Sequence, residues 1–239
     1  MGIPQHYSLD IPARCLALLD LCEPVVKSAG GRGRFGGPLN TTLLLALATP
    51  MISLPIERIY KNIDFGDREG MVDDRRVNPQ LAERLDAEIK RKTLRQNRYF
   101  SDLHWSFAKD VEIFNAAHPL STDLADQLSS DDAHEAARSM EMAQFVSCLR
   151  NALAHGGIMY LDGDGQSSTG QADMLLFVSA KPLIPDPVFD EKKGKYVNSR
   201  PVMESMRLLR IPQEDFRTFL KSWVTWLNEL GIIEDLDAA

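Results

Sequence analysis

Hydrophobic side chains recur at helical spacing along most of the chain. In residues 78–96, Leu81, Leu85 and Ile89 stand four positions apart, which places them on one face of an amphipathic helix. Similar patterns predict five further helical stretches: 7–26, 41–53 with more helix from 56, 101–117, 131–155 and 212–231. The last stretch has a core-facing stripe formed by Phe216, Phe219, Leu220, Trp223 and Leu227.

After residue 157 the pattern changes to short runs of β-forming residues. IMYLDGDG (158–165) and ADMLLFVSA (172–180) enclose a turn-forming DGDG sequence, which is typical of a β-hairpin. Residues 183–201 are predicted to form a loop or a second hairpin that turns at Gly194, and residues 205–211 a strand. These elements predict a mainly α fold, a helical bundle in a single domain over residues 1–239. A small β-hairpin insertion, at about 158–211, precedes its C-terminal helix.

Composition and charge narrow the possible functions. Hydrophobic residues make up 44% of the chain and charged residues 26%, which is normal for a protein that folds around a core. The net charge of −7 excludes a protein that coats nucleic acid non-specifically. One run is nevertheless basic, and it is either a solvated helix face or a candidate RNA-binding surface. The run consists of Lys90, Arg91, Lys92, Arg95 and Arg98.

Several other features exclude further classes. The three cysteines include no CxxC pair, so a secreted disulfide framework is not expected. The N-terminus lacks the pattern of a signal peptide. The most apolar run, residues 41–59, is interrupted by Pro50 and Pro55 and is too short to span a bilayer. We therefore expect a cytoplasmic protein with no membrane partner.

Neither a metal nor a cofactor is expected. His104, His118 and His134 do not share a metal-ligand spacing. The glycine-rich segment 27–40 lacks the G-K-[ST] ending of a phosphate-binding loop, so it is interpreted as a flexible connection.

The stretch CLRNALAHGG, residues 148–157, stands out within the predicted helix 131–155. Arg150 is the only fully charged side chain between residues 142 and 157. Small uncharged residues share a face of this helix, and such a face is usually covered by another surface. We expect a symmetric homodimer to cover it by pairing the patch with itself. The interface residues would be Ser147, Cys148, Asn151 and Ala154.

Two chemically useful side chains lie near this helix end. A guanidinium can bind phosphate through two hydrogen bonds, and an imidazole can move protons near pH 7. By helix geometry Arg150 lies about 140° round from His155 and ~7.5 Å along the axis. The alternative interpretation is structural: a histidine that interacts with the helix dipole and an ordinary surface arginine.

The six residues RNALAH, 150–155, resemble the R-x4-6-H signature of the HEPN superfamily, in which a polar residue commonly follows the arginine. The resemblance implies a HEPN-like bundle and a metal-independent endoribonuclease with a composite site at a homodimer interface. In such a site, Arg150 would stabilise charge on the phosphate, His155 would act as general acid or base, and Asn151 would position the RNA or the histidine. RNA products would end in 2′,3′-cyclic phosphates.

The resemblance also implies a biological setting, a toxin or phage-defence effector, with RNA and possibly an antitoxin protein as partners. Two alternatives stay open at this point. One is a non-catalytic HEPN-like module that binds nucleotide, RNA or a partner protein. The other is an interaction subunit that has nothing to do with RNA.

Overall fold

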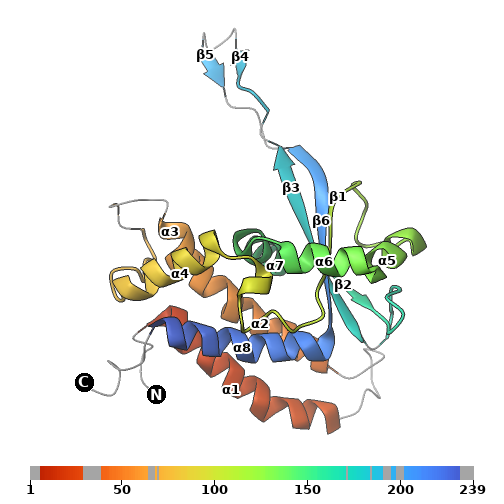
Figure 1. Cartoon of the computed structure of the whole chain (residues 1–239), viewed down its shortest axis with the longest axis horizontal. Coiled ribbons are helices and arrows are strands. Elements are labelled where there is room, and N and C mark those ends of the chain that lie inside the picture. Colours follow the sequence, from red (N-terminus) through yellow and green to blue (C-terminus); the bar gives the residue numbers. More distant parts are fainter. Residues whose placement is uncertain are drawn as a thin grey trace.

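The computed structural model describes residues 6–28, 39–63, 68, 70–170, 172–183, 185–190, 195–197 and 202–231. The fold is mainly α-helical, as predicted, with helices packed against an antiparallel sheet (Figure 1). The helical elements are α1 (Tyr7–Ser28), α2 (Asn40–Pro55), η1 (Ile56–Tyr60), α3 (Lys61–Ile63), α4 (Pro79–Arg91), η2 (Leu94–Gln96), α5 (Thr122–Ser129), α6 (Asp131–Ser139), α7 (Met142–His155) and α8 (Gln213–Gly231). The strands are β1 (Ser106–Val111), β2 (Ile158–Leu161), β3 (Met174–Leu183), β4 (Val188–Asp190), β5 (Lys195–Val197) and β6 (Val202–Pro212).

The main sheet has four antiparallel strands in the order β1-β6-β3-β2. Side chains alternate between its two faces, as strand geometry requires. On β3, Leu175 and Phe177 join the main core, whereas Leu176 and Val178 join a second, smaller core that includes Leu128 of α5. The sheet therefore lies between the main helical layer and α5.

The predicted hairpins are confirmed, but the insertion is not a simple hairpin. β2 pairs with β3, with Ile158 opposite Phe177, and β4 pairs with β5, with Asp190 opposite Lys195. Residues 191–194, which contain the expected turn, lie outside the described residues, as does most of the glycine-rich segment 27–40. β3 also pairs along its length with β6, and β6 pairs with β1 from before α7. The sheet thus combines one strand that precedes α7 in the sequence, β1, with three strands that follow it.

The helix predicted for residues 101–117 is wrong. Residues 106–111 form β1, in which Phe107 lies opposite Leu209 of β6. Phe107, Ala108 and Val111 are buried, and their spacing also fits one face of a helix. Pairing with a strand about a hundred residues away decides the conformation, because tertiary context overrides local propensity.

The helix predicted for residues 131–155 is two helices. Ser130 caps α6 by accepting a hydrogen bond from the Ala133 amide, and the backbone is extended at Met140 and Glu141 before α7 begins. There the Leu94 amide donates to the Met140 carbonyl at 2.8 Å, and the Met142 amide donates to the Lys92 carbonyl at 2.9 Å. These bonds to a neighbouring segment replace the helical bonds that would have continued α6.

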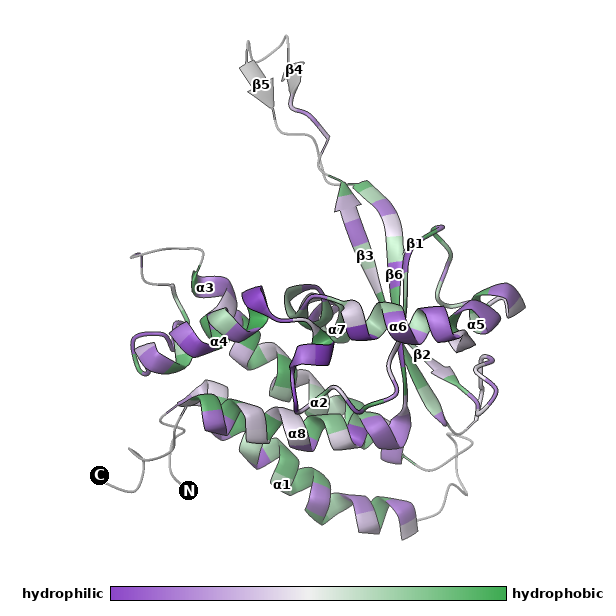
Figure 2. Ribbon diagram, viewed as in Figure 1, coloured by the Kyte–Doolittle hydropathy of each residue, from purple (hydrophilic) through white to green (hydrophobic). Residues whose placement is uncertain are grey.

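Local periodicity predicts the outer helices well. In α4 the Asn78 side chain caps the first turn, and Leu81, Leu85 and Ile89 are fully buried. Figure 2 shows hydrophilic positions along α4, whereas α2 is mostly hydrophobic. The predicted stripe of α8 is also buried. The ring centroid of Phe219 lies within 6 Å of the centroids of several other aromatic rings in the core.

Pro50 and Pro55 do not break the apolar helix. Residues Asn40–Ile63 form 24 continuous helical residues, long and apolar enough by composition to cross a membrane, which corrects the prediction that the run is too short. The core helix of a soluble protein can be equally long and apolar, and α2 packs against α1, α7 and α8. Its residues Met51 and Ile52 are fully buried.

Pro55 changes the hydrogen bonding of this helix. A proline has no amide hydrogen, so the carbonyl four residues earlier, that of Met51, loses its helical partner. The indole Nε1 of Trp223 on α8 donates to this carbonyl at 2.9 Å. Immediately after Pro55 the helix widens into the π turn η1, in which the Lys61 amide bonds to the Ile56 carbonyl. The proline is therefore accommodated by one bond from α8 and by a wider turn.

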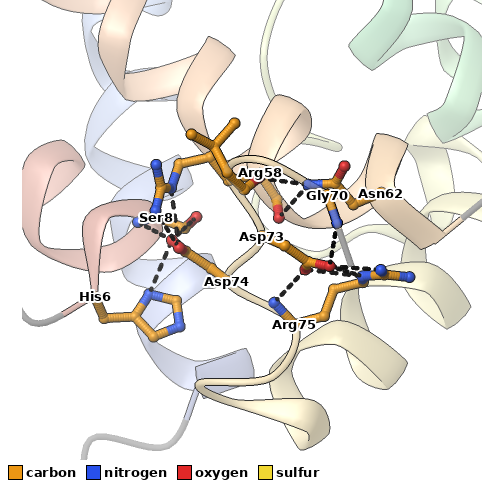
Figure 3. Close-up of polar contacts among 9 residues, drawn as sticks. His6, Ser8, Arg58, Asn62, Gly70, Asp73, Asp74 and Arg75 are labelled. Atoms are coloured by element: carbon orange, nitrogen blue, oxygen red, sulfur yellow. Dashed lines mark hydrogen bonds and ion pairs between the residues drawn. The ribbon is translucent and has the colours of Figure 1, made fainter. Parts of the chain in front are cut away.

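Figure 3 shows how η1 is tied to the start of α1. The buried carboxylate of Asp74 accepts hydrogen bonds from Arg58 Nε at 2.9 Å and from the amide and hydroxyl of Ser8 at 3.0 and 2.7 Å. Burial alone would raise the pKa of Asp74, but these hydrogen bonds outweigh it and hold the pKa below its usual value. Beside it, hydrogen bonds from Arg75 lower the pKa of Asp73 to about 2. Both carboxylates thus act as structural anchors.

Replacing Trp223 by Phe tests the compensation for Pro55. The variant leaves the Met51 carbonyl buried without a partner, which costs about 1–3 kcal/mol beyond the lost ring volume. Trp226→Phe is the matched control, because this indole is equally buried and its Nε1 has no partner among the described residues. Urea unfolding should show the larger loss of stability for Trp223→Phe. Equal losses would contradict this account.

Candidate functional site

The two glycines after the RNALAH sequence have separate structural roles. Gly156 has a φ of +70°, the left-handed conformation that ends a helix. At Gly157 a Cβ atom would lie 2.2 Å from the backbone oxygen of Val178, so only glycine allows β3 to come this close. The Val178 amide also donates to the Gly157 carbonyl at 2.7 Å. The end of α7 is therefore fixed against the sheet.

Arg150 is held by a residue that sequence reasoning missed. Its Nε donates to Oε1 of Glu57 on η1, 93 positions earlier in the chain. The ammonium of Lys61 lies 2.9 Å from the same carboxylate. Glu57 and Lys61 stand four residues apart in the sequence, the spacing of a helical ion pair, but nothing in that spacing identifies Arg150 as the third member.

Asn151 contacts the arginine. Nη1 of Arg150 donates to Asn151 Oδ1 at 2.8 Å, and Asn151 Nδ2 donates to Ser147 Oγ at 3.5 Å. Nη2 of Arg150 has no hydrogen-bond partner in the part of the chain that the structure describes. The Arg150 side chain is 21% exposed. Nε and Nη1 of the guanidinium are thus anchored, and Nη2 is left for a ligand.

His155 is placed differently. It is exposed at the last residue of α7, and within the described residues its side chain makes no hydrogen bond or ion pair, with Arg150, Asn151 or any other residue. The chain therefore presents an anchored arginine and a free histidine on one helix without bringing the two side chains together.

The predicted interface needs one correction. Cys148 is 1% exposed and belongs to the main core, and burial raises the pKa of its thiol. Helix α7 packs against β3 as well as against α2 and α4, so its small-residue side is partly covered by the sheet of the same chain. The helical pattern could not distinguish this sheet from a partner protein. Ser147 and Asn151 are partly exposed, and Ala154 is exposed.

The predicted RNA-binding run lies at the other end of α7. The segment around Lys92 is bonded to the first residue of α7, about 20 Å from His155 along the helix. Four of its basic side chains face carboxylates, in the pairs Lys90–Asp86, Lys92–Glu88, Arg95–Glu135 and Arg98–Glu229. Its positive charge is therefore largely balanced locally, while Arg91 is exposed at the end of α4. RNA binding by this run stays a prediction.

The remaining histidines have separate surroundings. His104 pairs with Asp215 at 2.7 Å, His134 Nδ1 donates to the Trp105 carbonyl at 2.9 Å, and His118 is exposed. Among the described residues, no three His, Cys, Asp or Glu side chains are grouped closely enough to hold a metal ion.

Comparison with known proteins identifies the family. A protein-family model described as HEPN pEK499 p136 matches residues 1–232, and the chain therefore belongs to this HEPN family. No curated protein and no solved structure matches it. The resemblance inferred from the RNALAH sequence is confirmed by this match.

Proposed function

We propose that this HEPN protein is a metal-independent endoribonuclease whose active site is built from two copies of α7 in a homodimer. The observation that carries the proposal is the contrast between Arg150 and His155. Within the described residues, Glu57 and Asn151 hold Nε and Nη1 of the arginine and leave Nη2 without a partner, whereas the histidine is exposed and its side chain has no hydrogen bond to the arginine. A second copy of the helix supplies the missing half of the pair.

The chemistry follows from these two groups. His155 takes the proton from a ribose 2′-hydroxyl, and the 2′-oxygen attacks the adjacent phosphorus. The bond from phosphorus to the 5′-oxygen of the next nucleotide breaks, and that oxygen receives a proton from the second copy of His155. Nη2 of Arg150 binds a phosphate oxygen as negative charge develops on it. Asn151 acts as a positioning residue, because its amide oxygen is occupied by Arg150.

The biological role that we propose is a toxin or phage-defence effector, which an antitoxin protein could neutralise. The second candidate is a non-catalytic HEPN module that binds nucleotide or RNA. It is favoured by the ion pair that already neutralises part of the charge on Arg150. Cleavage by the purified protein distinguishes the two.

Arg150→Ala and His155→Ala should each abolish cleavage of total RNA. Wild-type protein should cleave in excess EDTA, leave 2′,3′-cyclic phosphate ends and spare DNA of the same sequence, since DNA has no 2′-hydroxyl. Arg14→Ala on the exposed side of α1 is the control and should cleave at the wild-type rate. Cleavage of DNA, or a requirement for added metal, would move the assignment to the non-catalytic module.

Ala154→Glu should convert the proposed dimer into monomers. The interface that we propose contains Ser147, Asn151 and Ala154, and a glutamate at the exposed Ala154 places a bulky charge where small residues pack. Ala136→Glu on the exposed side of α6 is the matched control. Light scattering should give the mass of a dimer for the wild type and the control and of a monomer for Ala154→Glu. A dimer in all three would rule out this interface.

A further inference from the structure

A pocket of about 480 Å³ opens beside the end of α7. Gly156, the residue directly after His155, forms part of its wall. The other walls come from α2, from the loop before α5 and from β2 with the segment that follows it.

The walls are held in place by the protein's own hydrogen bonds. The Leu120 amide donates to Ser167 Oγ at 2.8 Å and ties the loop before α5 to the segment after β2. That segment is in turn bonded to β2 through the Ser168 amide and the Tyr160 carbonyl, at 2.9 Å. The loop itself contains a turn in which Asn115 Oδ1 accepts from the Ala117 amide at 3.0 Å. The pocket is therefore preformed, as ligand sites usually are.

The chemistry of the lining suits a neutral, flat heterocycle. Among the described residues, the lining contains no carboxylate, lysine or arginine. It offers the rings of His118 and Tyr160 for stacking and the hydroxyl of Thr169 for a hydrogen bond, against apolar walls that include Leu45. Unpaired RNA bases are recognised by this combination of stacking and hydrogen bonding.

A phosphate fits this place poorly. The pocket lies at the C-terminal end of α7, where the backbone carbonyls leave a partial negative charge. The charged part of a nucleotide would therefore stay outside the pocket while the neutral base enters.

We propose that this pocket binds the base of the RNA nucleotide next to the cleaved bond and so sets the sequence preference of the enzyme. The assignment rests on the proposed function. Because Gly156 both follows His155 and lines the pocket, a base seated there holds its ribose and phosphate within reach of the histidine. The volume of about 480 Å³ lies in the range of small-molecule sites.

The test uses a substitution that fills the pocket without disturbing the core. Ala117 is exposed on the loop, so Ala117→Trp adds a ring at the pocket wall, and Ala136→Trp on α6 is the matched control. Both are made in His155→Ala protein, so that RNA stays intact. Binding of AMP, CMP, GMP, UMP and all-ribose trinucleotides is measured by calorimetry or NMR.

We expect at least one trinucleotide to bind, with preference for one base, and Ala117→Trp to weaken its binding tenfold or more while Ala136→Trp leaves it unchanged. A free nucleotide that binds as tightly as the best trinucleotide would overturn the assignment to RNA. No binding to the parent protein, or equal binding by both tryptophan variants, would overturn the pocket itself.

A cleavage assay with the same two tryptophan variants, now made in protein that keeps His155, separates failure of the base pocket from failure of the proposed ribonuclease activity. If the wild type cleaves, Ala117→Trp should raise KM or change the preferred base while most of kcat is retained. If the wild type does not cleave but Ala117→Trp still loses trinucleotide binding, the proposed function fails and the base pocket stands.

Discussion

The carboxylate of Glu57 fixes the position of Arg150, and the turn that presents Glu57 also supports the N-terminal part of the fold. Two neighbouring residues of η1 bind different parts of the chain. Glu57 pairs with Arg150 on α7, and Arg58 pairs with Asp74, which in turn binds the start of α1. The wide turn follows a proline that cannot donate a backbone hydrogen bond. Such π turns occur frequently at functional sites, and this one connects the structural anchor to the site.

The same arrangement explains why α7 has so little charge. One side of the helix is packed against β3 and another against α2 and α4, which leaves a narrow exposed stripe that contains Ser147, Asn151, Ala154 and His155. Arg150, at the edge of this stripe, is fixed, and the His155 side chain on it is free. Two such stripes facing each other would unite the groups that one chain keeps apart, and the pocket beside Gly156 would lie at the end of the combined groove.

Local sequence patterns predict the elements whose stability is local. Asn78 and the four-residue spacing of Leu81, Leu85 and Ile89 define α4, and the two glycines define the end of α7. Residues 106–111 were mispredicted because their strand partner on β6 lies about a hundred positions away. The break between α6 and α7 was missed for a similar reason, since it depends on hydrogen bonds to Lys92 and Leu94.

The residues of the candidate site also differ in whether the sequence could predict them. Arg150, Asn151 and His155 could be found from the sequence, because they lie on one helix and match the HEPN signature. Glu57 could not, because 93 positions separate it from Arg150. Cys148 was assigned to the wrong surface, because a helical pattern shows that a face is covered but not whether a sheet of the same chain covers it.

The most direct test of the account is the cleavage rate of Glu57→Gln on a defined RNA. If Glu57 positions Arg150, kcat should fall about tenfold or more, because small displacements of a catalytic group are costly. KM and the midpoint of unfolding should change little. Glu83→Gln, on the exposed side of α4, should match the wild type. An unchanged kcat for Glu57→Gln would contradict the central claim that this carboxylate makes Arg150 competent for catalysis.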